Sequence, residues 1–235
     1  MFRFAFALAL VAGTALLAQA HFVFVVDNGT KIIFSDNLEP DTKVSMAKVE
    51  AGLKLFARDA AGKQVPVTFK SGKSELTVEL PPNTVVVAGS CTYGIIQKGE
   101  NKPYLLQYFP KTVVTPISTK PTEIKLSEQL PIEVVPVVEG TKLRFRVYAD
   151  GQPLAKATVA VLESGNAGNK DQKDQKDQKW QSAETDLQGY APGSYDKPGT
   201  YAVRVHRVRE VKGTHDGKDY DMAKQYATLV VRFER

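Results

Sequence analysis

The chain has 235 residues, and its 31 basic and 26 acidic residues give a mild net charge of +5. Charges of both signs alternate along it, and no basic tract carries interleaved aromatic residues, which excludes a typical nucleic-acid-binding surface. A chain of this length can build one large or two small hydrophobic cores. The only cysteine, Cys91, excludes an internal disulfide, and the apolar run before it predicts a buried, inert thiol.

Residues 1–20 have the three parts of a secretory signal peptide. Arg3 precedes the uncharged run from Phe4 to Leu17, and the small-x-small triplet Ala18-Gln19-Ala20 follows it. The apolar run is shorter than the roughly 20 residues that a membrane helix needs, and no second such run follows. We therefore predict cleavage after Ala20, a periplasmic or secreted protein, and no mature transmembrane segment. An uncleaved N-terminal anchor is the alternative.

The first half of the mature chain consists of short β-forming runs separated by turn signals, a spacing that is typical of a sandwich. The alternation in residues 75–80 places one face of that strand on a core. The expected strands are residues 21–26, 31–34, 53–58, 65–69, 75–80 and 84–88, with a short helix over residues 42–51. Five prolines from Pro110 to Pro136 predict a connector, so we expect an N-terminal β-sandwich domain over residues 21–127.

The second half repeats a strand–turn–strand layout. Residues 142–148 alternate, Asp150-Gly151 marks a turn, and residues 157–162 form the next expected strand. With Gly199-Thr200-Tyr201 opening a later strand, this order resembles immunoglobulin-like or transthyretin-like sandwiches of exported bacterial proteins, in which the tyrosine closes the core edge. We expect such a domain over residues 128–235, and hence an all-β protein of two tandem β-sandwich domains.

A charged insert interrupts this second domain at residues 166–180. Its Lys-Asp-Gln repeat contains no apolar residue and cannot form a core. We interpret it as a solvated loop insert, with a charged docking tail as the alternative. Trp180, the only tryptophan, lies at the end of this polar insert.

Cleavage after Ala20 would make His21 the first residue of the mature chain. Its free α-amine, with an ordinary pKa of about 7.7–8.0, and its imidazole, with one of about 6.5, can then bind one metal ion together near neutral pH. One more imidazole would complete a site of three nitrogens, which suits Cu(II) or Ni(II) better than magnesium or calcium. The chain has only two further histidines, His206 and His215.

His206 lies on the expected strand over residues 201–211. Alternation places it on the face of Ala202 and Arg204, away from the core. His215 lies in the polar segment 212–221, where Asp-Gly favours a turn and Asp216, Asp219 and Asp221 are possible outer partners or weak ligands. Each histidine taken singly also has an interpretation without metal: His21 as a chance occurrence after the signal peptide, His206 as a solvated residue on an outer strand face, and His215 as a salt-bridged surface group.

The mature start His21-Phe22-Val23-Phe24-Val25-Val26 resembles a bacterial family of exported domains of unknown function. Members of that family are described as periplasmic components of nickel or cobalt uptake, or as a "nickel uptake substrate-specific transmembrane region". Further similar stretches are residues 92–94, 105–111, 215–221 and 225–229. The resemblance implies a secreted β-sandwich with a link to nickel or cobalt, and it supplies no ligand set.

We therefore predict an extracytoplasmic protein that binds nickel, cobalt or copper through His21, His206 and His215, and that captures the ion or delivers it to a membrane transporter. No Gly-x-Ser-x-Gly, His-Glu-x-x-His or phosphate-loop motif indicates catalysis. Two alternatives remain. One is a copper redox enzyme that acts on polysaccharide at the same histidine, which would need a flat aromatic surface around the metal. The other is a structural or adhesive sandwich without metal.

Overall fold

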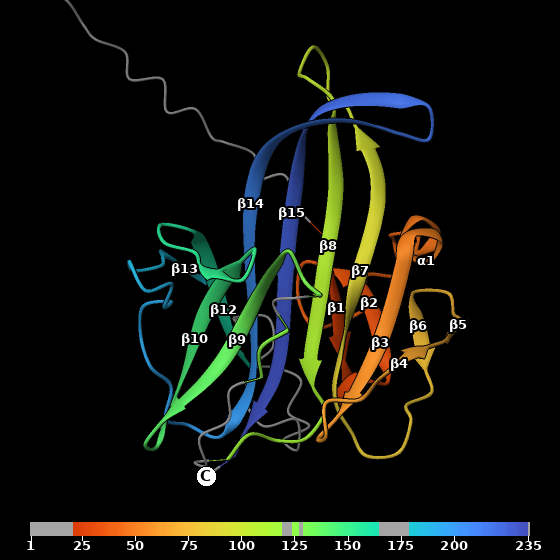
Figure 1. Cartoon of the computed structure of the whole chain (residues 1–235). Coiled ribbons are helices and arrows are strands. Elements are labelled where there is room, and N and C mark those ends of the chain that lie inside the picture. Colours follow the sequence, from red (N-terminus) through yellow and green to blue (C-terminus); the bar gives the residue numbers. More distant parts are fainter. Residues whose placement is uncertain (1–20, 119–123, 127–128, 165–178, 235) are drawn as a thin grey trace, which may run out of the picture.

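The computed structural model describes residues 21–118, 124–126, 129–164 and 179–234, and within them the protein is all-β, as predicted. Its largest sheet has eight strands, and two smaller sheets cover parts of it (Figure 1). In spatial order the large sheet contains β13 (Gln181–Glu184), β12 (Thr158–Ser164), β14 (Gly199–His215), β15 (Lys218–Phe233), β8 (Tyr104–Val113), β7 (Thr84–Ile96), β3 (Leu53–Asp59) and β4 (Gln64–Val67).

The smaller sheets hold the remaining strands. One has the order β1 (Phe22–Val26), β2 (Lys31–Ser35), β6 (Glu75–Val78) and β5 (Phe69–Ser71), and the other β11 (Gln152–Pro153), β10 (Lys142–Ala149) and β9 (Ile132–Glu139). A short 3-10 turn, η1 (Asp27–Gly29), joins β1 to β2, and one α-helix, α1 (Ala47–Gly52), precedes β3. No helix among the described residues is long and apolar enough to cross a membrane.

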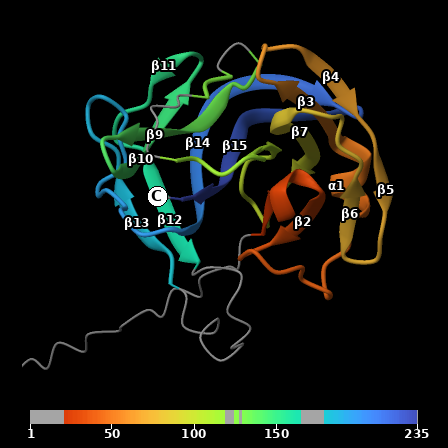
Figure 2. The same cartoon turned by 90° about the horizontal axis from the view of Figure 1, so that it is seen from below.

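The large sheet contains strands from both predicted domains. β8 of the first half pairs in parallel with β15 of the second, and the other ladders are antiparallel. One core fills the space between the large sheet and β9–β10, and a second lies between the large sheet and the β1–β2 side (Figure 2). The predicted boundary at residue 127 stays a prediction, and the signal peptide lies outside the described residues.

The structure differs from the expected connector at both ends. β8 continues through Pro110 to Val113, and β9 begins at Ile132 and includes Pro136. Residues 65–69 also do not form one strand, because β4 ends at Val67 and β5 begins at Phe69 in another sheet. The expected helix is shorter and begins at Ala47.

The segment around His215 is a hairpin rather than a loop. β14 runs to His215 and β15 begins at Lys218, so Asp216 and Gly217 alone form the turn. Both have positive φ, 49° and 72°, as a type I′ hairpin turn requires, and this confirms the predicted Asp-Gly turn. Figure 1 shows this hairpin bending across the ends of β8 and β7.

The insert over residues 166–180 was predicted to be a solvated loop, and the position of Trp180 corrects this prediction at its C-terminal end. Residues 165–178 lie outside the described part of the chain, but Trp180 stacks on Phe24 with ring centroids 6.2 Å apart. Its Nε1 donates a hydrogen bond of 3.0 Å to the Asp36 carbonyl. The tryptophan therefore packs on a small core to which β1, β2, β12, β14 and β15 contribute.

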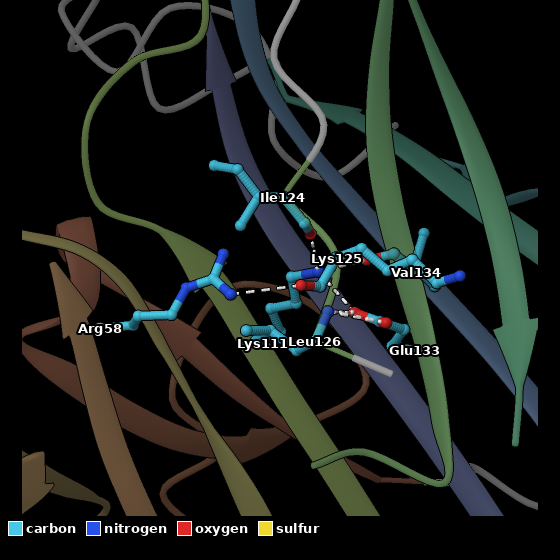
Figure 3. A network of polar contacts seen from close by, with 7 residues as sticks. All are labelled: Arg58, Lys111, Ile124, Lys125, Leu126, Glu133 and Val134. Carbon is cyan, nitrogen blue, oxygen red and sulfur yellow. Dashed lines mark hydrogen bonds and ion pairs between the residues drawn. The ribbon is translucent and has the colours of Figure 1, made fainter. Parts of the chain in front are cut away.

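A buried ion pair joins β8 to β9 (Figure 3). Lys111 Nζ lies 2.8 Å from Glu133 Oε2, and the side chains are 1% and 0% exposed. The ammonium group also donates to the carbonyls of Ile124 and Val134, at 2.5 and 3.2 Å. The carboxylate accepts the Leu126 N–H at 2.9 and 3.0 Å. The pair thus holds the crossing segment 124–126 against the large sheet.

Tyr201 closes the edge of the larger core, as the sequence predicts. Its side chain is fully buried, and its hydroxyl donates a 2.8 Å hydrogen bond to the Lys197 carbonyl. Burial raises the pKa of this phenol to about 12, with a further contribution from Glu163, so the hydroxyl stays a donor at neutral pH.

We expect Tyr201→Phe to lower the free energy of unfolding by about 1–2 kcal/mol, because the Lys197 carbonyl loses its buried donor. Urea unfolding monitored by circular dichroism measures this loss. Tyr104→Phe, at the half-buried start of β8, is the matched control and should change the value by less than about 0.5 kcal/mol. Equal effects of the two substitutions would contradict a special role for the Tyr201 hydroxyl.

Candidate metal centre

His21 lies just before β1 and is held on three sides. Its Nε2 lies 2.8 Å from Asp41 Oδ2, and its ring packs against Phe34 with centroids 5.4 Å apart. Its carbonyl accepts a 3.2 Å hydrogen bond from the Tyr108 hydroxyl. The β1–β2 register explains the Phe34 contact: Val23 pairs with Phe34, and the side chains of residues 21 and 23 point to the same face.

The contact with Asp41 determines which ring nitrogen of His21 is free. The hydrogen bond from His21, followed by the one from the Lys43 N–H, holds the pKa of Asp41 below its usual value, so this carboxyl group is ionised and only accepts. Nε2 must therefore carry the hydrogen, and the neutral ring keeps its lone pair on Nδ1. Nδ1 is the nitrogen that forms a six-membered chelate ring with the α-amine of the same residue.

His206 lies on β14, on the predicted face. It stacks on Tyr226 with ring centroids 5.5 Å apart, while its other side is exposed. Partial burial, and then the charge of Lys224, lower the pKa of His206 below its usual value, so its imidazole is neutral at neutral pH. Neutral imidazole is the form that binds metals.

A row of aromatic side chains connects the surroundings of His206 and His21. His206 pairs with Tyr226 across β14–β15, and Tyr226 pairs with Tyr108 across β15–β8. The two tyrosine rings stack with centroids 5.7 Å apart, and Tyr108 donates to the His21 carbonyl. The fold thus brings His21 and His206 to opposite ends of one tyrosine pair, although the described contacts do not join the two imidazoles directly.

His215 lies at the end of β14, at a separate cleft. Its Nε2 is 3.4 Å from Asp216 Oδ2, and the cleft of about 570 Å³ is also lined by Tyr93 and by Lys48, Lys54 and Lys218. Asp219 instead accepts a hydrogen bond from the Thr214 hydroxyl. The Tyr93 ring contacts both Phe34 and Tyr108, so this cleft borders the same aromatic cluster as His21.

Within the residues that the structure describes, no group of three or more His, Cys, Asp or Glu side chains is placed to hold a metal ion. The α-amine of a chain that begins at His21 belongs to the backbone. The finding on side chains therefore does not bear on a chelate formed by that amine and Nδ1 of His21. The site of three histidines stays a prediction.

Cys91 is buried, as predicted. Desolvation raises the pKa of its thiol to about 12, so it has no thiolate character at neutral pH. Its Sγ lies 3.6 Å from the Val49 carbonyl. Cys91 pairs with Tyr108 across β7–β8, on the side of Tyr108 that is opposite to Tyr226.

Sequence reasoning missed Asp41, Tyr108 and Tyr226. Asp41 is an ordinary polar residue of the segment between β2 and α1, and nothing in the sequence links it to His21. The two tyrosines fall in stretches that carry the family resemblance, but their role as a bridge depends on the parallel pairing of β8 with β15.

A family model with the description "Domain of unknown function (DUF4198)" matches residues 18–209. The matched segment contains His21, Asp41, Tyr108 and His206, and it ends before Tyr226 and the tip of the β14–β15 hairpin. No curated protein matches the chain.

Proposed function

The chain belongs to this DUF4198 family of domains of unknown function, and from that premise we propose that the mature protein binds a divalent transition metal at a chain start formed by His21. The proposal rests chiefly on one observation, the 2.8 Å contact between His21 Nε2 and Asp41. A carboxylate on the outer nitrogen of a metal-binding histidine fixes the tautomer and orients the ring.

The residues of the proposed site fit Cu(II), Ni(II) or Co(II). The α-amine and Nδ1 of His21 would supply two nitrogens, and His206 is the proposed third ligand because it borders the same tyrosine pair. Nitrogen donors of this kind favour tetragonal Cu(II) or Ni(II). His215 is the weaker candidate, since it lines a different cleft.

The role that this chemistry supports is capture of nickel, cobalt or copper outside the cytoplasm, with delivery to a membrane transporter. It requires export and cleavage after Ala20. Mass spectrometry of the protein secreted by its native host tests this requirement, and a mature chain that starts at any other residue would remove the chelate.

The binding test compares a chain that begins at His21 with the same chain preceded by Gly-Ser-Gly-Ser-Pro. The extension keeps the imidazole and Asp41 but moves the amine out of chelating reach. Titration with Cu(II) and Ni(II), followed by calorimetry and visible absorption, should show one site in the first chain and at least about tenfold weaker binding in the second. Equal affinities would refute the amino-terminal chelate.

We expect Asp41→Asn to lower the affinity for Cu(II) by about 10–100-fold, because the amide no longer fixes His21 with a negative charge. Glu39→Gln is the matched control, since it removes an exposed carboxylate two residues away.

His206→Phe, which can keep the stack on Tyr226 but lacks a ring nitrogen, should lower the affinity for Cu(II) about tenfold. Unchanged affinity in that variant would reject His206 as a ligand, and the proposed chelate at His21 would still stand.

A further inference from the structure

A second pocket of about 250 Å³ lies beside the start of β1, on the face of the large sheet that carries His206. The register places the residues of its floor side by side: the small Ala160 on β12 pairs with the small Ser182 on β13 and, on its other side, with Arg204 on β14. The rings of Phe22 and Tyr226 line its wall. The pocket thus combines an apolar wall with one cationic group.

Arg204 is held in place by two aromatic rings. The centre of its guanidinium lies 4.1 Å from the Trp180 ring centroid and 4.5 Å from that of Phe22. Cation–π contacts of this kind are stronger where the cation is partly desolvated. The side chain has therefore already lost much of its rotational freedom, and a ligand that binds it pays less entropy for ordering it.

The guanidinium keeps donors available for a ligand. It has five N–H groups, and among the described residues its hydrogen bond is the long one from Nη1 to the Asp36 carbonyl, at 3.5 Å. Arg207 and Arg144 differ in this respect, because their guanidinium groups are bound to Asp150 and Glu139. Arg204 is thus a pre-oriented cation at a pocket whose lining contains no carboxylate, and the charge of Asp36 acts on it from outside that lining without a side-chain hydrogen bond among the described contacts.

We infer that this pocket binds a small organic monocarboxylate, with the carboxylate on the Arg204 guanidinium and the apolar part of the ligand against Phe22 and Tyr226. The planar fork of arginine matches the two oxygens of a carboxylate. A single arginine matches a single negative charge, and the volume admits a molecule of a few carbon atoms but not a polymer. His206, the proposed third metal ligand, also lines this pocket, but the carboxylate contact requires neither the amine nor a ring nitrogen of His21, so it can be tested in the metal-free chain.

The test is titration of the metal-free chain beginning at His21 with butyrate, inorganic phosphate and butylamine, followed by nuclear magnetic resonance shifts of the Trp180 indole N–H. We expect saturable shifts with butyrate, at least tenfold weaker binding of phosphate, and none with butylamine. Absence of saturation with butyrate would overturn the proposal. Phosphate binding as tight as butyrate would overturn the assignment of a carboxylate with an apolar part.

Variants locate the binding. Arg204→Met should weaken butyrate binding at least tenfold, whereas Arg209→Met, which removes an exposed charge from the opposite face of β14, should leave it unchanged. Because Arg204→Met could disturb the packing of Trp180, Ser182→Leu provides an independent test: it fills the floor from an exposed edge position and should also abolish binding. Full affinity in Ser182→Leu would place the ligand elsewhere and refute the site.

Discussion

Lys111→Met should lower the free energy of unfolding by about 3–5 kcal/mol, because it leaves the Glu133 carboxylate buried without its cation. Both side chains are almost completely inaccessible, and the Leu126 N–H that Glu133 also accepts is a neutral donor that does not replace the charge of the ammonium group (Figure 3). Removing one member of a buried pair costs the desolvation of the charge that remains, which is larger than the net worth of the pair. Domains are commonly stable by only about 5–15 kcal/mol, so this loss is a substantial part of the total.

The control for this prediction is the double variant Lys111→Met/Glu133→Leu. It removes both charges, so its loss should be clearly smaller than the sum of the two single losses. Urea unfolding gives all of these free energies, and the far-ultraviolet circular dichroism of each variant reports whether it still folds. A loss below about 1 kcal/mol in Lys111→Met would show that water or another group compensates the carboxylate.

Period-two alternation was the most informative signal in the sequence. It correctly placed Tyr201, Val203 and Val205 in the core and His206 on the opposite face. It works there because successive side chains of a strand point to opposite faces, whatever its partner is. Alternation does not reveal the partner, so the parallel pairing of β8 with β15 could not be predicted, and neither could the tyrosine row that depends on it.

Prolines lie inside strands of this protein for a physical reason, and the connector expected from Pro110 to Pro136 was therefore wrong at both ends. Pro136 lies on β9, an edge strand of its sheet, and Pro66 lies on β4, an edge of the large sheet. Edge strands tolerate proline because one side needs no N–H donor. Pro110 is in an interior strand, but the β7–β8 ladder has no pair at that residue, between Cys91–Tyr108 and Ala88–Lys111. Each of these prolines therefore lies where one side of its strand needs no N–H donor, and none of them marks the end of a strand.

The residues of the candidate site also differ in whether the sequence could identify them. The histidines were identifiable because the chain has only three of them. Asp41 was not, because a loop aspartate carries no periodic signal and its contact with His21 spans 20 residues. A ligand on a strand can thus be placed on a face by alternation, whereas the partner that orients it depends on how a loop folds back.

Gly89→Ala should lower the free energy of unfolding by about 3 kcal/mol or more, because the added methyl group meets backbone. A Cβ at this position would lie 2.1 Å from the Lys54 carbonyl oxygen and 2.8 Å from Leu55 Cδ2. Gly89 pairs with Leu55 across β7–β3, so relief requires those strands to separate at a buried point of the large sheet. Overpacking that side-chain motion cannot relieve is costly.

Ser90→Ala is the matched control for this change. It alters the next residue of β7, whose side chain points to the other face and is half-buried, and it should change the free energy of unfolding by less than about 0.5 kcal/mol. Thermal and urea unfolding of both variants provide the comparison. If Gly89→Ala were as stable as Ser90→Ala, β3 and β7 could not lie as close together as their register here requires.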